Sequence, residues 1–455
     1  MPSSRRSFLR RAATLSGAAV LAPSMAGLVS RLDGQAVVTV RRAGVGEGGY
    51  GPLRPAGPEL ALPEGFRYWV LSEIGQPMSD GSPTPDGFDG MAAFPRPNGD
   101  VRLVRNHENR DAAGTARLLG ESALAYDPLA GGGTTTLDVR IGDDGIPRVV
   151  RDFVSLSGTI VNCAGGPTPW GSWLTCEESV GGAAQGWQRE HGYVFEVPAR
   201  AESEVAAVPI VAMGRFVHEA VAVDPHSGFV YLTEDAGRSG FYRYLPRTPG
   251  RLLDGGRLEM LALTDHPNHD TATGQWMGTT RSVRWVPIDD ANPGPGAPSV
   301  FTQGYAHGGA RFARLEGCWY GDGGIFFHAT SGGDAGVGQV WHHRPDPIGG
   351  GQLTLVFESP SRDVLDYPDN ITVSPRGGLV LCEDGAGEQY VRGLTLDGRI
   401  FDLARNTVNT SEFCGACFAP DGETLFVNIQ GSTTRTGTTR GMTLAIRGPW
   451  RAGAL

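Results

Sequence analysis

Lysine is absent from this sequence: all 39 basic residues among its 455 are arginines. A Walker-type phosphate loop, a lysine Schiff base with pyridoxal phosphate and a Ser–Lys catalytic pair all need lysine, so these are excluded. The 49 acidic residues leave a formal net charge of −10. This charge argues against nucleic-acid binding, which relies on clustered basic residues. A Gly-x-Ser-x-Gly nucleophile elbow and a His-Glu-x-x-His zinc motif are missing as well.

Long hydrophobic segments are also scarce. The chain begins with a twin-arginine pair, Arg5-Arg6, and an apolar stretch follows over residues 12–22. This stretch is too short to span a bilayer, and small residues after it offer a cleavage site. We therefore expect residues 1–26 to be an export signal read by the twin-arginine export machinery, and the mature protein to be periplasmic or secreted. No second stretch is long enough to predict a membrane span.

Cysteine is too rare for a disulfide scaffold, with six residues in a chain of this length. Cys414 and Cys417 have the spacing of a redox motif. However, turn-forming residues follow them, whereas thioredoxin-type pairs lie at the start of a helix. We therefore favour a pair at the start of a strand, either oxidised or simply packed.

Glycine, by contrast, is abundant, with 68 residues. Helical periodicity is not sustained after the signal, and short β-rich runs bounded by turn residues recur instead. Six segments share a polar opening, a strand, a turn and a second strand with a polar end: 90–108, 162–178, 218–235, 314–333, 368–384 and 414–430. Six such hairpins predict an all-β fold, a six-bladed β-propeller with inserted loops. The predicted boundaries are a Gly/Pro-rich approach over 27–58 and the propeller over 59–450.

The polar ends of these hairpins are expected to meet at one mouth of the propeller channel. So many carboxylates would repel one another without cations, which predicts bound metal ions. Oxygen ligands suit calcium, whereas a thiolate suits iron or zinc. Strand alternation predicts that Cys176 and Glu178 point one way and Glu177 the other. Glu219 is a better ligand candidate than His218, which we expect to be a packed residue.

Arg314 and Glu316 flank a single apolar residue and are expected to share one face of a strand. A guanidinium beside a metal-bound carboxylate can grip a phosphoryl oxygen, although an ordinary salt bridge explains the pair equally well. Asp369 and Asn370 follow a proline, so they either initiate a turn or supply oxygen ligands to calcium.

A set of ordered motifs resembles one known family. The motifs are Asn106-His-Glu108, Thr175-Cys-Glu-Glu178, His218-Glu-Ala220, Thr233-Glu-Asp235, Arg314-x-Glu316, Pro368-Asp-Asn370, Cys382-Glu-Asp384 and Phe418-x-Pro-Asp-Gly422. Together with the twin-arginine leader, they resemble the PhoX-type alkaline phosphatases, of which this chain would be a compact member. Each motif is weak alone, and their order makes the resemblance specific.

The resemblance implies an exported enzyme that hydrolyses small-molecule phosphate monoesters at an iron–calcium cluster in the propeller channel. The implied iron ligands are Cys176, Glu219 and Glu316. The implied ligands of calcium, or of both metals, are Glu108, Glu177, Glu178, Asp369, Glu383 and Asp384. Arg314 and Asn106 would hold the substrate phosphate. Two other functions remain open on the residues alone: a calcium-dependent propeller lactonase or esterase, and a non-catalytic binding module stabilised by calcium.

Overall fold

Antiparallel strands form most of the computed structural model, which describes residues 40–455. The predicted export signal, residues 1–26, lies outside this range. All six predicted hairpins are present as antiparallel strand pairs. Helices are few and short: α3 (Val300–Ala306) and the 3-10 turns η1 (Ala183–Gln185), η2 (Val211–Met213), η3 (Leu252–Asp254) and η4 (Trp450–Ala452). Among the described residues, no helix has the length and apolarity needed to cross a membrane.

The strands form five sheets. The first contains β5 (Phe88–Pro95), β6 (Val101–His107), β7 (Gly132–Ile141) and β8 (Pro147–Thr159). The second contains β9 (Asn162–Pro167), β10 (Ser172–Glu177) and β11 (Val194–Pro198). The third has nine strands in the order β12 (His218–Val223), β13 (Val230–Glu234), β14 (Phe241–Pro246), β15 (Gly256–Leu263), β16 (Thr280–Pro287), β20 (Gly351–Glu358), β19 (Gln339–Pro345), β18 (Gly324–Ala329) and β17 (Leu315–Gly321).

Segments from the start of the described chain complete the last two sheets. The fourth sheet contains β21 (Pro368–Val373), β22 (Leu379–Glu383), β23 (Tyr390–Leu394) and β24 (Arg399–Asn406), joined by β3 (Leu60–Leu62), β2 (Arg54–Pro55) and β1 (Arg41–Arg42). The fifth contains β25 (Phe413–Phe418), β26 (Leu425–Ile429), β27 (Met442–Arg447) and β4 (Arg67–Glu73). Because β4 pairs with β27, strands from opposite ends of the chain share this sheet.

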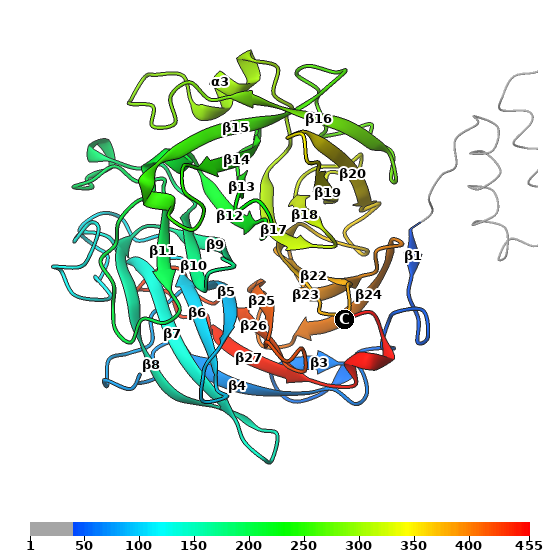
Figure 1. Cartoon of the computed structure of the whole chain (residues 1–455). Coiled ribbons are helices and arrows are strands. Elements are labelled where there is room, and N and C mark those ends of the chain that lie inside the picture. Colours follow the sequence, from blue (N-terminus) through cyan, green and yellow to red (C-terminus); the bar gives the residue numbers. More distant parts are fainter. Residues whose placement is uncertain (1–39) are drawn as a thin grey trace, which may run out of the picture. The chain divides into compact units, whose positions relative to one another are not determined.

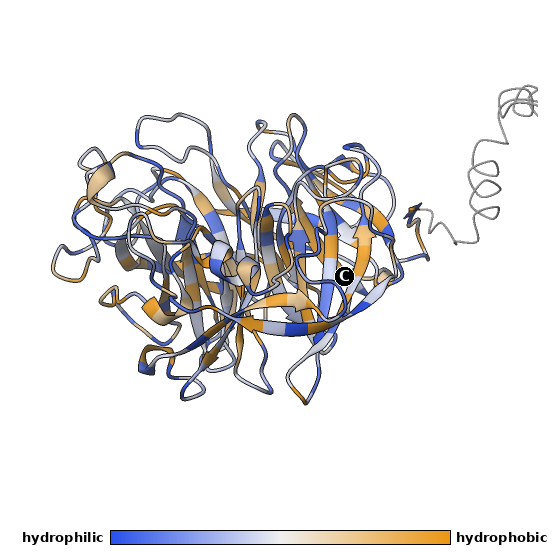
Figure 2. Cartoon of the chain, turned by 90° about the horizontal axis from the view of Figure 1, so that it is seen from above, coloured by the Kyte–Doolittle hydropathy of each residue, from blue (hydrophilic) through white to orange (hydrophobic). Residues whose placement is uncertain are grey.

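The first strand of each hairpin lies at the centre of the molecule (Figure 1). In chain order these inner strands are β5, β9, β12, β17, β21 and β25. Each contacts the next, and β25 contacts β5, so that the inner strands form a closed ring. Apolar side chains fill the space between neighbouring sheets; one cluster joins Met91 and Leu103 to Phe426 and Ala445. Figure 2 shows hydrophobic residues interspersed with hydrophilic ones along the strands.

Candidate metal and phosphate site

The second residue of each inner strand occupies a special position. These residues are Asp89, Cys163, Glu219, Glu316, Asp369 and Cys414. In all six hairpins the pairing of the inner strand with its neighbour shifts register at this end. A bulge of this kind bends a strand and re-aims its side chains. The ring of inner strands thus brings carboxylate and thiol side chains together at one end of the channel.

Small residues directly after this position allow the inner strands to approach closely. A Cβ atom on Gly90 would lie 2.6 Å from Cα of Ala164, and one on Gly415 would lie 2.4 Å from the carbonyl oxygen of Asp89. Neither distance is compatible with a side chain, so glycine is required at both positions. The close approach places the preceding residues of neighbouring strands near one another.

The second strand of four hairpins contributes another set of acids. Its last residue is followed directly by a carboxylate at Glu108, Glu178, Asp235 or Asp384. Glu412, which directly precedes β25, adds one more. Four overlapping groups have ligand atoms within 4.8 Å of one another: Glu108, Cys163 and Glu178; Cys163, Glu219 and Asp369; Asp89, Glu108 and Glu412; Asp369, Asp384 and Glu412. We call these seven carboxylates and one thiol the acidic cluster.

Burial and mutual repulsion make the acidic cluster unfavourable without cations. Burial, reinforced by neighbouring carboxylates, raises the pKa of Glu219 and Glu412 well above the ordinary range. The pKa of Glu108 rises to about 8, mainly through burial, although Arg110 opposes the shift. Four buried carboxylate oxygens have no hydrogen-bond partner among the described residues. Oε1 of Glu108 forms an ion pair with Arg110, whereas Oδ1 of Asp89, Oε2 of Glu219 and Oε2 of Glu412 have no partner of either kind. Such unpaired oxygens are the donors that a hard cation requires.

Cys163 is the thiol of the acidic cluster. Its Sγ donates a hydrogen bond to Oε1 of Glu219 at 3.2 Å. Burial and the charges of Asp89 and Glu219 raise the pKa of this thiol well above its usual value. A bound cation would offset both effects and favour the thiolate, so the two groups that contain Cys163 suit a softer metal than the all-oxygen groups do.

Two arginines border the acidic cluster and remain partly exposed. Arg314 donates to both oxygens of Asp235 at 2.8 Å, and its Nη2 also lies 2.8 Å from Oε1 of Glu316. Arg110 bridges Glu108 and Glu178 through Nη2, at 2.8 Å from Oε2 of Glu178. Nη1 of Arg314, and Nε and Nη1 of Arg110, donate to no other described residue. These N–H groups are available to a ligand that approaches from solvent.

The structure brings most of the predicted site residues to this centre. Glu108, Glu178, Glu219, Asp369 and Asp384 lie within the acidic cluster. Glu316 adjoins it, because the charges of Asp235, Asp369 and Glu178 all raise the pKa of its carboxyl group.

Cys176 and Glu177 are not in the acidic cluster. Cys176 is buried in an apolar core with Leu174 and Val194. The Glu177 carboxylate accepts four hydrogen bonds from the protein: from backbone N–H groups of residues 160, 192 and 193, and from Nδ1 of His191. The expectation from strand alternation was wrong here because β10 ends at Glu177, so the pleat does not extend to Glu178.

Glu383 and Asn106 also differ from expectation. Glu383 pairs with Arg392 at 2.8 Å and accepts from the backbone N–H of Asp366, so its carboxylate is used within its own sheet. Asn106 is fully buried and does not face solvent. Its Nδ2 donates to the carbonyl oxygens of Cys163 and Ala164, and its Oδ1 accepts from Trp173. Asn106 therefore fixes the backbone of the thiol residue.

Asp89, Cys163 and Arg110 were not among the site residues predicted from the sequence. A signal for the first two is present in the chain: an acid or a cysteine, then a small residue, recurs at Asp89-Gly, Cys163-Ala, Glu219-Ala, Glu316-Gly and Cys414-Gly. Alignment of these five hairpins on this pair would have identified both residues. Cys414 shares the position but turns its Sγ to the carbonyl oxygen of Phe88 at 3.0 Å. All six cysteines are free and buried, so Cys414 and Cys417 are a packed pair and not a disulfide.

Fold and site together define a propeller-type protein whose centre can hold metal ions. The sequence matches the family described as alkaline phosphatase PhoX over residues 48–150 and 146–432. Because these regions include most of the chain, the protein belongs to the PhoX alkaline phosphatase family.

One solved structure agrees with this assignment at the level of the fold. Pseudomonas fluorescens PhoX, solved in complex with vanadate as a transition state analogue, superimposes with a TM-score of 0.67 at 19% identity, covering 89% of this chain and 98% of that one. A gluconolactonase from Xanthomonas campestris reaches a TM-score of only 0.41 at 14% identity, covering 88% and 99% of the two chains. No curated protein sequence matches the chain.

Proposed function

We propose that this protein is a metal-dependent phosphatase that hydrolyses phosphate monoesters at an iron–calcium cluster. One observation carries the proposal: seven carboxylates and a thiol, with unpaired buried oxygens, are bordered by two arginines with free N–H groups. Carboxylates in this number require cations, and free guanidinium N–H groups beside them suit a phosphate. Membership of the PhoX family supports the same chemistry.

The types of donor atom suggest which groups of the acidic cluster would bind iron and which would bind calcium. Iron would be held by one of the two groups with the thiolate, Cys163 with Glu219 and Asp369, because Glu316 adjoins this group. Calcium would be held by the two groups that contain only carboxylates, both of which include Glu412. One group is Asp89, Glu108 and Glu412, and the other is Asp369, Asp384 and Glu412. When bound, the metals would neutralise the phosphate charge and stabilise the leaving oxygen. Cys163 thus takes the place that the resemblance gave to Cys176.

The arginines would bind and orient the phosphoryl group. Asp235 holds two donors of the Arg314 guanidinium, and Glu178 holds one donor of Arg110. A guanidinium fixed by carboxylates is pre-organised, so less conformational entropy is lost when its free N–H groups bind a ligand. Arg110 follows the hairpin that begins with inner strand β5, and Arg314 directly precedes inner strand β17, which is three places further along the ring. We therefore infer that they contact the phosphate from opposite sides.

We further infer six blades and export. The nine-stranded sheet has an inner strand at each end, β12 and β17, and its halves meet where β16 pairs with β20. It is best understood as two blades joined at their outer edges, which together with the other four sheets makes six. The twin-arginine sequence at Arg5-Arg6 supports export by the twin-arginine machinery to the periplasm or the medium.

Element analysis combined with hydrolysis assays tests this function. The exported protein is expected to contain iron and calcium, to hydrolyse p-nitrophenyl phosphate faster than bis(p-nitrophenyl) phosphate, and to lose activity to a chelator. Activity should return only when both metals are restored. Protein that contains both metals but hydrolyses neither ester would overturn the proposal. Calcium without iron, together with hydrolysis of a lactone, would instead indicate a lactonase.

A further inference from the structure

A cavity lies directly beside the acidic cluster, behind the chain segment 108–111. Glu108 and Arg110 of this segment belong to the cluster and its border, whereas Asn109 and Asp111 line the cavity. Two other segments also contribute to both the cavity and the cluster. In segment 86–89, Asp86 lines the cavity and Asp89 belongs to the cluster. In segment 430–435, Arg435 lines the cavity and Gln430 donates a hydrogen bond to Glu108 at 2.6 Å. The cavity and the acidic cluster are thus built from the same three chain segments.

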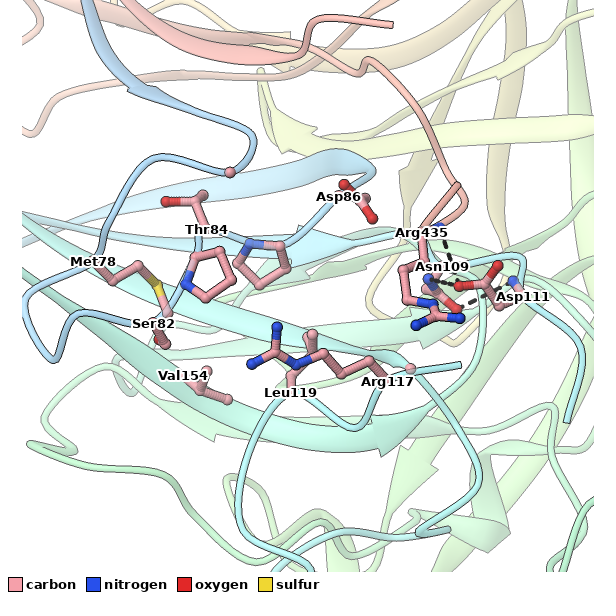
Figure 3. Close-up of a pocket in the computed structure, with 14 residues that line it drawn as sticks. Met78, Ser82, Thr84, Asp86, Asn109, Asp111, Arg117, Leu119, Val154 and Arg435 are labelled. Carbon is pink, nitrogen blue, oxygen red and sulfur yellow. Dashed lines mark hydrogen bonds between the residues drawn. The ribbon is translucent and has the colours of Figure 1, made fainter. Parts of the chain in front are cut away.

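Backbone hydrogen bonds hold the three segments together. The N–H of Gly87 donates to the carbonyl of Ser432 at 2.7 Å, and the N–H of Arg110 donates to the carbonyl of Thr433 at 2.8 Å. The backbone N–H of Arg435 donates to Oδ2 of Asp111 at 3.1 Å, a contact drawn in Figure 3. The acidic cluster and the cavity are thus parts of one preformed structure.

The side chains around the cavity leave both donors and acceptors free. The carboxylate of Asp86 and the guanidinium groups of Arg117 and Arg435 form no hydrogen bond or ion pair within residues 40–455, the part of the chain that is described. Figure 3 shows the side chain of Arg117 extending into the cavity, with Asp86 on the other side. Burial and the charge of Asp111 raise the pKa of Asp86 to about 6, so this group is an ionised acceptor at neutral pH and above.

Charge and size narrow the class of ligand. The cavity is lined by two acids, Asp86 and Asp111, and by two arginines, Arg117 and Arg435, so its formal charge is zero. Its other walls include apolar surface from Met78, Leu119 and Val154 and from two prolines. Its volume of about 180 Å³ is roughly that of six water molecules at about 30 Å³ each. A neutral group that both donates and accepts hydrogen bonds, with apolar ring carbons, fits this lining.

We propose that this cavity binds the alcohol part of the substrate, and that the preferred alcohol is polyhydroxylated, as in a sugar phosphate. The proposal rests on the proposed phosphatase function, because it places the phosphate at Arg110 and Arg314. The sugar hydroxyls would donate to Asp86 and accept from Arg117 and Arg435. A simple alkyl phosphate would leave the cavity to water and gain none of these contacts.

The test compares glucose 6-phosphate with ethyl phosphate, which has the same reacting group but no ring. The metal-loaded wild-type protein is expected to show a kcat/KM at least tenfold higher for the sugar ester. Replacement of the free groups, in Asp86→Ala and Arg117→Ala, is expected to lower kcat/KM for glucose 6-phosphate about tenfold per variant, since each loses a charged hydrogen bond. The kcat/KM for ethyl phosphate should change less than twofold.

The control variant is Arg67→Ala, which removes an exposed arginine on β4 that does not line the cavity. It should keep the wild-type preference, and thermal unfolding should confirm that all three variants fold. Equal rates on the two esters in the wild-type protein, or a preference that survives in both cavity variants, would overturn the proposal.

Failure of the phosphatase function would be distinguishable from failure of the cavity assignment. If neither ester is hydrolysed, the proposed function is wrong. Binding of methyl glucoside to the intact protein, measured by ligand-observed NMR, then tests the cavity alone. A signal that is lost in Asp86→Ala and Arg117→Ala but kept in Arg67→Ala would support the cavity, and an unchanged or absent signal would exclude it.

Discussion

Glu177 and Glu178 are adjacent and chemically identical, yet their surroundings differ completely. Glu177 is the last residue of β10, and its carboxylate accepts four hydrogen bonds from backbone N–H groups and His191. Glu178 lies just beyond the strand, where it contacts Arg110 and joins the acidic cluster. One carboxylate is used to hold the protein together, whereas the other can bind a ligand.

The same division recurs in the other hairpins. His107 bonds to the backbone of Asp86 and to Thr135, while Glu108 joins the cluster. Glu234 accepts from Tyr242 while Asp235 holds Arg314. The last residue of the strand thus forms hydrogen bonds within the fold, and the residue directly after it lies at the candidate site. The end of the strand, and not the residue type, decides which role an acid takes.

The largest expected effect comes from two cysteines that differ in the same way as these acids: Cys163 lies in the acidic cluster, whereas Cys176 lies in the apolar core. Cys163→Ser should remove the thiolate from the acidic cluster and lower kcat for p-nitrophenyl phosphate at least 1000-fold, with loss of iron from the purified protein. Cys176→Ser changes a residue in the apolar core, so we expect a loss of about 1–2 kcal/mol in the free energy of unfolding but nearly unchanged iron content and kcat.

Iron content and steady-state kinetics of the two variants, measured side by side, check this prediction. Wild-type iron and activity in Cys163→Ser, or loss of both in a folded Cys176→Ser, would reverse our assignment of the thiol ligand. Circular dichroism on the same samples separates loss of metal from loss of fold.

The second prediction applies the comparison to the adjacent acids. In Glu177→Gln an amide NH₂ group would face buried backbone N–H groups, and the His191 ring would lose its carboxylate partner. We expect a loss of about 3 kcal/mol in the free energy of unfolding, with a lower melting temperature. Glu178→Gln removes a charge from the repulsive acidic cluster, so the metal-free variant should be at least as stable as the wild-type protein, and metal binding should be weaker.

Urea unfolding of the metal-free variants measures the first difference, and calcium titration of the folded variants measures the second. If Glu178→Gln were the less stable variant and Glu177→Gln the weaker metal binder, the division of roles between these residues would be wrong.

Much of the fold was predictable from the chain because its repeat is local. Turn residues and polar strand ends mark each hairpin, and all six predicted pairs form. The site was less predictable, because the orientation of a side chain changes at a strand end. Alternation placed Cys176 beside Glu178, but the pleat stops at Glu177. The role of Asn106 depends on Trp173 and Cys163, which are distant in sequence and adjacent only after folding.

The smallest expected effect concerns Glu234, the strand-end partner of Asp235. Burial raises the pKa of Glu234 from 4.5 to about 7, although Tyr242 and the N–H of Gly240 oppose the shift. Between these values the unfolded chain releases this proton while the folded protein keeps it, so the free energy of unfolding falls as pH rises from about 4.5 to about 7. Glu234→Gln has no such proton. The wild-type protein should therefore lose about 2 kcal/mol more than the variant over this range, measured by urea unfolding of both metal-free proteins. Parallel pH profiles would show that the pKa of Glu234 is the same in the folded and unfolded protein, and that the strand-end acids are less isolated from solvent than their burial indicates.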